Sequence, residues 1–196
     1  MKAVLYTQYG APEVLHLAEI PLPEPEDHEI RVRVQATSVT SGTQWARQGK
    51  HPDSRLFTLA LRAFMGFRGP RNPILGYEFA GQVEAVGKNV TRFQVGDQVF
   101  GTTTGLSSGA YAEALCMPEA RKSGVVALSP PHLPPEAAAV VPIGGMTALY
   151  LLKKAKLQQG QGILIYGASG SVGSYAMQLA KHHFGATVTG VCSTGN

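Results

Sequence analysis

The sequence predicts a β-barrel-like domain over residues 1–124, followed by an α/β unit over residues 125–196 that contains a single strand–helix–strand. Two observations carry this prediction. Short segments that alternate apolar with polar side chains fill the first part, whereas the second part follows a proline-rich stretch and shows helical spacing. A chain of 196 residues is long enough to bury one core in each of two such domains.

Six short strands are expected in the first domain. Residues 14–18 and 29–36 alternate apolar with polar side chains, which is typical of half-buried strands. The complete set of expected strands is 2–6, 14–18, 29–36, 78–86, 98–101 and 110–117. Glycines punctuate the later part of this domain, as in a sheet that curves sharply: Gly76, Gly81, Gly87, Gly96, Gly101 and Gly109.

The composition excludes several classes of protein. An apolar fraction of 44% with 15% charged residues is typical of a globular protein, and a net charge of +4 is too small to indicate nucleic acid by itself. Cys116 and Cys192 are too few for a disulfide framework or a four-cysteine zinc site. No apolar run approaches the ~18 residues of a membrane span, and no signal peptide is visible. We therefore expect a cytoplasmic protein with no membrane partner.

The segment 47–71 is both basic and aromatic. It contains one acidic residue, Asp53, together with six basic residues and three phenylalanines: Arg47, Lys50, Arg55, Arg62, Arg68, Arg71, Phe57, Phe64 and Phe67. One interpretation is a flap that binds an anionic cofactor or RNA. The interpretation we favour is an amphipathic helix whose basic face is solvated, so a nucleic-acid partner is not expected.

The second part begins with a proline-rich linker that contains Pro130, Pro131, Pro134 and Pro135. Residues 136–156 are expected to be helical, with a break around Pro142–Gly145. The segments that follow are a strand at 161–166, a glycine-rich loop, a helix at 174–184 and a strand at 187–192.

The glycine-rich loop GASGSVG carries the main functional signal. Gly167, Gly170 and Gly173 are three residues apart, between an expected strand and an expected helix. Small residues let the backbone approach a pyrophosphate, and the helix N-terminus then presents N–H groups to the phosphates. This context predicts a Rossmann dinucleotide loop, whose cofactor-binding residues are Gly167, Ala168, Ser169, Gly170, Ser171, Val172 and Gly173.

The end of the following strand predicts which nicotinamide cofactor binds. An acidic residue there would bind the ribose 2′-hydroxyl and repel a 2′-phosphate. This chain has Cys192, Ser193, Thr194 and Gly195 instead, which favours NADPH over NADH, although no Arg or Lys is present at 193–196 to bind the 2′-phosphate. Ser193 and Thr194 are therefore expected to contact the cofactor.

Four stretches together resemble the medium-chain dehydrogenase/reductase superfamily, in its zinc-independent quinone oxidoreductase (zeta-crystallin-like) branch. They are LGYEFAGQVEAVGKNVTRFQVGDQVFG at 75–101, GAYAE at 109–113, PIGGMTALYLL at 142–152 and ILIYGASGSVGSYAMQLAK at 163–181. The resemblance implies a GroES-like catalytic domain followed by a Rossmann domain, with the active site in the cleft between them.

The resemblance also bears on zinc. Zinc-dependent relatives carry a cysteine where this chain has Thr40, a histidine where it has Tyr77, and a third ligand near Ile143. Threonine and tyrosine are poor zinc ligands beside thiolate and imidazole. We therefore expect no metal.

Without zinc, the resemblance implies direct hydride transfer from NADPH to a quinone or an α,β-unsaturated carbonyl. Tyr77 and Thr40 would line the substrate pocket and polarise the carbonyl or relay a proton, although a purely structural role is equally open for each. Thr147 matches the family threonine that lies by the nicotinamide. Trp45 is interpreted either as a pocket wall or as part of the core.

The end of the chain departs from the family pattern, because only the first strand–helix–strand of a Rossmann fold follows the linker. We expect a fragment of a longer protein, or a short product that forms a homodimer to cover its open sheet edge. Two other functions stay open: a catalytically inactive GroES-like interaction module, and RNA binding through residues 47–71.

Overall fold

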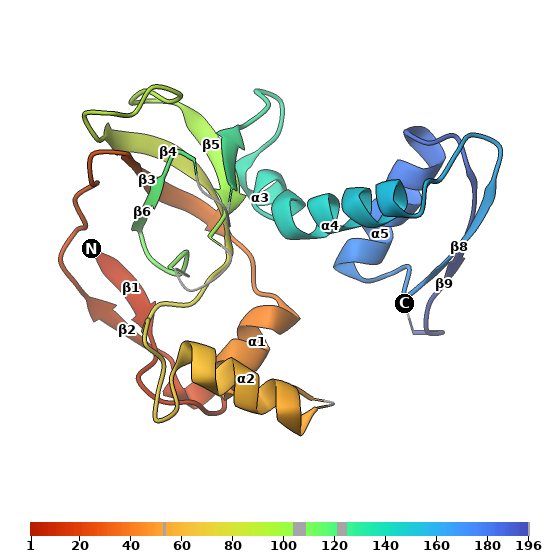
Figure 1. Ribbon diagram of the computed structural model, residues 1–196. Helices are drawn as coiled ribbons and strands as arrows, with labels where there is room; N and C mark the ends of the chain where they lie inside the picture. Colours follow the sequence, from red (N-terminus) through yellow and green to blue (C-terminus); the bar gives the residue numbers. More distant parts are fainter. Residues whose placement is uncertain (53, 104–108, 121–124, 196) are drawn as a thin grey trace. The chain divides into compact units, whose positions relative to one another are not determined.

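The computed structural model describes residues 1–52, 54–103, 109–120 and 125–195. The chain divides into two compact units, Met1–Val140 and Val141–Asn196 (Figure 1). This division falls later than the boundary expected after residue 124, which itself lies outside the described residues. The first unit extends further because β7 (Val125–Leu128) pairs with β5 (Gln98–Thr102) in its main sheet.

The first unit is built on a curled five-stranded antiparallel sheet with the strand order β6-β3-β4-β5-β7. The central strands β3 and β4 pair from Ile30 opposite Val86 to Thr37 opposite Phe79, with two register shifts along the way. Such irregularities bend a sheet and increase its twist. The remaining strands of this sheet are β3 (Glu29–Thr37), β4 (Glu78–Val86) and β6 (Ala114–Pro118).

A separate hairpin completes the β structure of the first unit. β1 (Lys2–Leu5) and β2 (His16–Glu19) pair antiparallel, with a short 3-10 turn, η1 (Pro12–Val14), between them. β1 is tied to the rest of the unit by isolated bridges from Ala3 to Ala112 and from Leu5 to Ile74. The expected curved β domain is confirmed, with β7 as an additional strand and with β6 starting later than expected.

Alternation along β3 separates the core from the outer face of the sheet. Ile30 and Val32 are completely buried, and they pack with Phe79, Val83 and other apolar side chains. The residues that alternate with them, Arg31 and Arg33, point to the outer face. This period of two is what places one face of a strand in a core.

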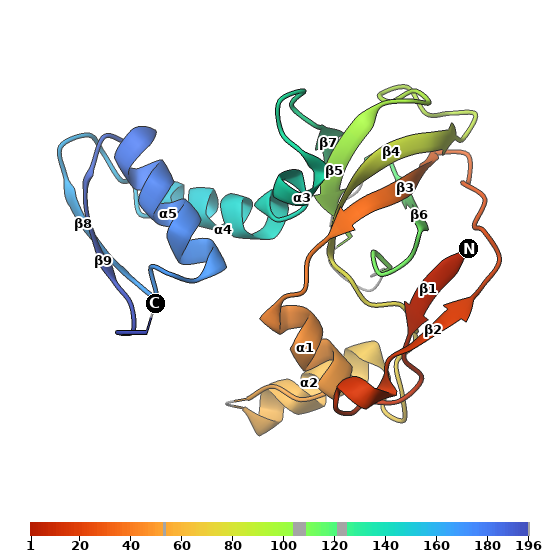
Figure 2. The ribbon, with the colours of Figure 1, turned by 180° about the vertical axis from the view of Figure 1, so that it is seen from behind.

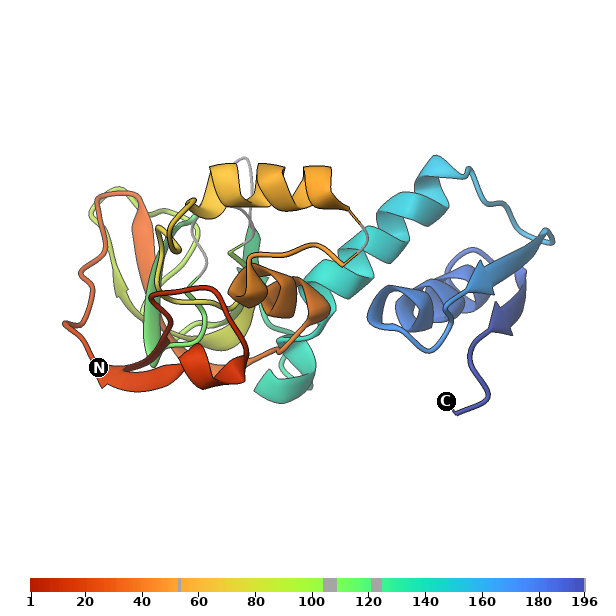
Figure 3. The ribbon, with the colours of Figure 1, turned by 90° about the horizontal axis from the view of Figure 1, so that it is seen from below.

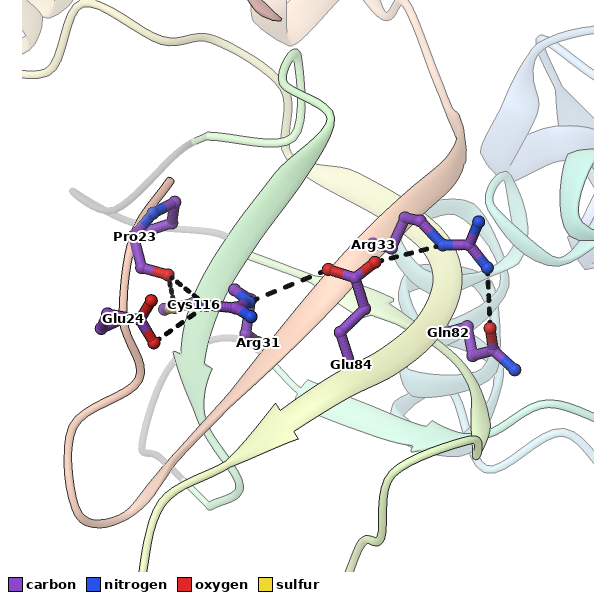
Figure 4. A network of polar contacts seen from close by, with 7 residues as sticks. All are labelled: Pro23, Glu24, Arg31, Arg33, Gln82, Glu84 and Cys116. Carbon is purple, nitrogen blue, oxygen red and sulfur yellow. Dashed lines mark hydrogen bonds and ion pairs between the residues drawn. The ribbon is translucent and has the colours of Figure 1, made fainter. Parts of the chain in front are cut away.

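The outer face carries a polar network around Arg31 (Figure 4). The Arg31 guanidinium donates to the Pro23 carbonyl at 3.1 Å and pairs with Glu24 at 2.9 Å, while Arg33 pairs with Glu84 at 3.3 Å. Ion pairs with exposed partners such as Glu24, which is 79% exposed, contribute little to stability, although the Arg31 side chain itself is only 14% exposed. Their structural effect is to attach the segment that follows β2 to the outer face of β3.

Two helices lie together at one end of the first unit: α1 (Ser41–Gln48) and α2 (Arg55–Met65) (Figures 1 and 3). α1 begins with a capping box in which the Thr40 hydroxyl accepts from the Thr43 N–H and the Thr43 hydroxyl accepts from the Thr40 N–H. Ser54 caps α2 in the same way by accepting from the Phe57 N–H. Near the end of this unit, α3 (Pro135–Ala138) contacts β3 and β4.

The second unit is the first strand–helix–strand of a Rossmann fold, preceded by a long helix (Figure 2). α5 packs on both α4 and the two strands, and Ala148, Leu152, Ala176 and Ala180 form the core between the helices. The elements are α4 (Val141–Lys154), β8 (Gly162–Tyr166), α5 (Ser171–His182) and β9 (Thr187–Val191), and β8 and β9 are parallel.

One expectation about the second part is wrong. The helix does not break around Pro142–Gly145, because α4 starts at Val141 and continues through these residues. Pro142 lies in the first turn, where a missing N–H costs no hydrogen bond. The interruption lies earlier, between α3 and α4.

The close pairing of β3 and β4 predicts a large effect at Gly81. A Cβ there would lie 2.0 Å from the Arg33 carbonyl oxygen, so Gly81→Ala forces the two strands apart and should lower the free energy of unfolding by about 1–3 kcal/mol. Gly42→Ala is the matched control. Its Cβ would meet nothing nearer than the Thr40 hydroxyl at 3.5 Å, and we expect it to stabilise α1 by about 0.4–1 kcal/mol.

Urea unfolding followed by Trp45 fluorescence measures both variants, since Trp45 is the only tryptophan and lies in the first unit. Equal stability of the two variants would contradict the close approach at Gly81.

Candidate functional site

The glycine-rich loop is fixed at its start by the end of β9. The N–H groups of Gly167 and Ala168 both donate to the Val191 carbonyl, at 2.8 and 3.0 Å. Gly167 has a φ of +78°, a conformation that side chains other than glycine rarely adopt. The chain therefore turns sharply from β8 into the loop.

The loop also requires glycine where the helix passes closest to it. A Cβ on Gly173 would lie 2.1 Å from the Gly167 carbonyl oxygen, so only glycine permits this approach. Gly170 is the N-cap of α5 and provides no side-chain cap, and the neighbouring Ser169 and Ser171 are exposed. The N-terminus of α5 thus presents exposed small residues and uncapped N–H groups, a surface that fits the pyrophosphate of a dinucleotide.

Two further glycines support the loop, and sequence reasoning missed both. Gly190 lets β9 pass Ala168 and Met177, since a Cβ there would lie 2.9 Å from atoms of each. Gly144 lets α4 approach the start of α5, where a Cβ would lie 2.5 Å from the Ser171 hydroxyl. Glycine inside a strand often marks a close approach, so Gly190 carried a readable signal.

The other expected cofactor residues lie in the same unit as the loop. Thr147 is half-buried on α4, one turn after Gly144, whose backbone lies against Ser171. Ser193 and Thr194 are exposed directly after β9. All of the residues expected to contact the cofactor thus belong to Val141–Asn196.

Tyr77 and Thr40 belong to the first unit. Tyr77 is half-buried just before β4, in a cluster with Tyr6, Leu75 and Tyr111. Burial raises its pKa above the ordinary value, and Tyr111 raises it further. The phenol therefore stays protonated at neutral pH, and its hydroxyl has no hydrogen-bond partner among the described residues. Tyr77 is available as a hydrogen-bond donor and not as a base.

Thr40 has a clear structural role as the cap of α1, described above. Tyr111 connects it with the Tyr77 cluster, because the Tyr111 hydroxyl lies 3.1 Å from both the Thr43 hydroxyl and the Ser38 carbonyl oxygen. The capping box and the tyrosine cluster therefore form one continuous region. Thr40 uses its side-chain oxygen as an acceptor there, which leaves its hydroxyl proton free to donate.

A buried carboxylate under this region was missed by sequence reasoning. Glu78 is 3% exposed, and its carboxylate accepts a hydrogen bond from the Ser38 hydroxyl. A buried polar group is tolerated only when such partners are present. The Glu78 main-chain carbonyl also accepts from the Thr37 hydroxyl at 2.7 Å, so the end of β3 and the start of β4 are joined at this point.

Trp45 is not a fully buried core residue, and its interpretation as a pocket wall stays a prediction. It is half-buried on α1, and its ring contacts that of His51 at a centroid distance of 5.0 Å with the planes tilted by 51°, while His51 in turn contacts Phe57 at 5.1 Å. These three rings link α1 to α2. Neither interpretation of Trp45 predicted these ring contacts, because nothing in the sequence marked His51 as a contact of Trp45.

The basic segment 47–71 differs from the expectation of a solvated basic face. α2 carries only Arg55 and Arg62, and Arg62 turns inward, where its Nε donates to the Gly49 carbonyl at 3.0 Å. The exposed side of α2 is apolar instead. The expectation holds for Lys50, Arg55, Arg68 and Arg71, which are exposed. It fails for the face of α2, because the sequence gives the periodicity of a helix without showing which side faces the solvent. Asp53, the acid of this segment, lies outside the described residues.

A shallow groove of about 540 Å³ lies beside Tyr111 in the first unit, with Val34, Val39 and Leu17 among its lining residues. Neither Tyr77 nor Thr40 lines it. Within the described parts of the chain, no three His, Cys, Asp or Glu side chains gather where they could hold a metal ion. The helices described here include none that is long and apolar enough to cross a membrane.

Comparison with known proteins agrees with this fold and loop. Residues 26–130 match the alcohol dehydrogenase GroES-like domain. Quinone oxidoreductase from Pseudomonas aeruginosa is 37% identical over 185 residues, which cover 92% of this chain and 49% of that protein. Quinone oxidoreductase from Homo sapiens is 33% identical, covering 99% of this chain and 53% of that protein. The chain thus spans about half the length of the curated relatives that it matches.

Solved structures lead to the same assignment. The quinone oxidoreductase from Coxiella burnetii superposes with a TM-score of 0.84 at 31% identity, over 100% of this chain and 57% of that one. The Escherichia coli quinone oxidoreductase solved with NADPH gives a TM-score of 0.78 at 28% identity, over 100% and 54% of the two chains. The class is a GroES-like domain joined to the start of a Rossmann domain. The chain belongs to the medium-chain dehydrogenase/reductase superfamily, in its quinone oxidoreductase branch.

The tyrosine cluster predicts opposite effects for two matched substitutions. Tyr111→Phe removes the hydroxyl that contacts Ser38 and Thr43, and it should lower the free energy of unfolding by about 1 kcal/mol. Tyr6 is completely buried, and its hydroxyl has no hydrogen-bond partner among the described residues. Tyr6→Phe should therefore leave stability unchanged or raise it, because it removes an unsatisfied polar group. Chemical denaturation of the two variants makes this comparison, and a larger loss for Tyr6→Phe would contradict it.

Proposed function

We propose that the protein is an oxidoreductase that transfers hydride from NADPH to a quinone or an α,β-unsaturated carbonyl without a metal ion. The observation that carries the proposal is the geometry of the Gly167–Gly173 loop, which combines a left-handed turn, an uncapped helix N-terminus and a glycine at the closest backbone approach. A binding module with no dinucleotide has no need for this combination.

The cofactor would be held entirely by residues of the second unit. The backbone of Gly167–Gly173 faces the pyrophosphate at the start of α5, and Ser193 and Thr194 meet the adenosine ribose after β9. Thr147 lies on the nicotinamide side. When bound, NADPH supplies the hydride from its nicotinamide ring.

Two points support NADPH over NADH. No acidic residue follows β9 among Cys192, Ser193, Thr194 and Gly195, so nothing at this position would repel a 2′-phosphate. The Escherichia coli quinone oxidoreductase, a structural relative, was solved with NADPH.

Tyr77 is the proposed hydrogen-bond donor to the substrate carbonyl. Its raised pKa keeps the phenol neutral, so it can donate a hydrogen bond to the oxygen where negative charge develops during hydride addition. Thr40 is the proposed second hydroxyl of the pocket. A conjugated acceptor needs less activation than a simple ketone, which makes hydrogen bonding sufficient without a Lewis acid.

Two relatives favour a conjugated acceptor. One is named 2-methylene-furan-3-one reductase, from Solanum lycopersicum, with 33% identity over 100% of this chain and 48% of that protein. The other is the CurK enoyl reductase structure, with a TM-score of 0.83 at 25% identity, over 99% and 55% of the two chains. Both names describe reduction of an unsaturated compound.

Fluorescence titration with NADPH, with NADH in parallel, tests the proposal on this chain. We expect saturable binding that favours NADPH. Gly170→Val should weaken it by about tenfold or more, because the side chain occupies the path of the pyrophosphate. Gly162→Val is the matched control in the same unit, since a Cβ there meets nothing within 4 Å and the site lies at the far end of β8.

The outcome then separates cofactor binding from chemistry. Saturable binding should be followed by NADPH oxidation on addition of a quinone or an enone. A folded chain that binds neither cofactor, or a Gly170→Val variant with unchanged affinity, would remove the loop assignment.

The two cysteines give an independent test of where the cofactor lies. Cys192 is exposed directly after β9, whereas Cys116 is half-buried and burial raises its pKa to about 11. A thiol reagent at neutral pH should therefore modify one thiol quickly, and Cys192→Ser should abolish that fast phase. NADPH should slow the reaction at Cys192 by several-fold. Full reactivity of Cys192 at saturating NADPH would contradict contact between the cofactor and residues 192–194.

A further inference from the structure

The helix α2 exposes an apolar face that no other described residue of the first unit covers. None of its residues is buried, and its outward side chains are strongly exposed: Leu56 by 77%, Phe57 by 65%, Leu59 by 55% and Phe64 by 61%. At about 100° per residue these side chains, with Ala60 and Ala63, occupy an arc of about 160°. An exposed apolar surface of this kind marks an interaction site.

The polarity of α2 is inverted relative to an ordinary surface helix, which turns its apolar side to the core. The half-buried side contains the two polar residues Thr58 and Arg62 together with Leu61 and Met65. Thr58 accepts a hydrogen bond from the His51 N–H at 3.0 Å. The apolar face is therefore turned outward by specific inward contacts and not by an absence of contacts.

The helix is also held firmly at its C-terminal end. Arg62 donates to the Gly49 carbonyl at 3.0 Å, and its guanidinium lies over the Tyr9 ring at 5.2 Å. The Tyr9 hydroxyl donates to the Gly66 carbonyl at 2.7 Å. These contacts fix the orientation of α2, so its apolar face is a preformed surface.

The surroundings of this face are basic. Lys50, Arg55, Arg68 and Arg71 are exposed, on both sides of the apolar residues along the chain, and Phe67 beside Arg68 is 60% exposed. Asp53 is the single acid in residues 41–77. Arg55 lies in the first helical turn, where the helix dipole disfavours positive charge, so its charge does not stabilise α2.

We propose that α2 docks on the surface of an anionic lipid bilayer, with its axis in the plane of the membrane. Leu56, Phe57, Leu59 and Phe64 enter the boundary between headgroups and acyl chains, while the flanking basic residues bind lipid phosphates. An amphipathic helix with a broad apolar face and basic flanks binds in this way without spanning the bilayer. The proposal is independent of the proposed reaction, and it revises the expectation that the chain has no membrane partner.

Two other occupants fit the surface less well. Single-stranded RNA is bound by a basic groove with aromatic rings on which bases stack, whereas most of this face is aliphatic. In a two-fold pair of α2 helices, the basic ends would meet the basic ends of the second copy and repel them. An anionic bilayer can bury the apolar face and bind the basic residues that flank it.

Vesicle co-sedimentation of the chain tests the proposal. We expect binding to phosphatidylcholine vesicles that contain phosphatidylglycerol, weaker binding to pure phosphatidylcholine, and loss of affinity as salt increases. Leu56→Gln combined with Leu59→Gln should weaken binding to the anionic vesicles by about tenfold or more.

Leu17→Gln combined with Leu128→Gln is the matched control, since these leucines are 67% and 57% exposed and belong to β2 and β7 instead of α2. It should change vesicle affinity by less than about twofold, and circular dichroism should show both double variants to be folded. Arg68→Gln with Arg71→Gln should reduce the preference for anionic lipid. Phe64→Trp should shift its emission to the blue on binding and be quenched by brominated lipids.

Several outcomes would overturn the proposal. The proposal fails if the folded chain does not bind anionic vesicles. It also fails if the two leucine double variants weaken binding to these vesicles equally. If the Leu56/Leu59 variant instead abolished self-association measured by sedimentation without lipid, the face would belong to a second copy. If it abolished salt-sensitive binding of an RNA oligonucleotide while vesicles were not bound, the face would belong to RNA.

Discussion

The antiparallel pairing of β3 with β4 determines where the candidate substrate region of the first unit forms. β3 ends at Thr37 and β4 begins at Glu78, so their pairing brings Ser38 and Thr40 to the same end of the sheet as Tyr77. The pair is closed there by the Thr37 hydroxyl on the Glu78 carbonyl and by Ser38 on the Glu78 carboxylate. Tyr111 then joins this end to the cap of α1. The tyrosine cluster, the buried acid and the start of α1 all depend on this one register.

The second unit rests on a different constraint, the approach of two backbones with no side chain between them. The parallel pair of β8 and β9 fixes the carbonyl of Val191, which holds the start of the loop, and Gly173 lets α5 lie against Gly167. Because the contact is between main-chain atoms, its geometry does not depend on rotamers. A phosphate site built from backbone N–H groups is rigid for the same reason.

Local patterns predicted the local parts of this structure. The glycine-rich loop, α5 and the two parallel strands could be predicted because strand, loop and helix follow one another directly along the chain. The network around Tyr111 could not, because its hydroxyl reaches Ser38 across 73 positions of sequence. β7 was missed because four apolar residues identify neither a strand nor its partner. For α2 the spacing indicated a helix, but the outward direction of its apolar side is set by contacts of Arg62 and Thr58 that the spacing does not contain.

The position of the N-terminal strand has a consequence for how the chain folds during synthesis. β1 pairs with the nearby β2, but its Val4 N–H also donates to the Tyr111 carbonyl, and Ala3 bridges to Ala112. β1 therefore completes its contacts only after Tyr111 and Ala112 have been translated. The sheet around β3 and β4 can bury Ile30 and Phe79 before then, and the second unit adds its own core later. During this interval the β1–β2 hairpin lacks its contacts with the rest of the first unit, so it stays accessible to a chaperone or a protease.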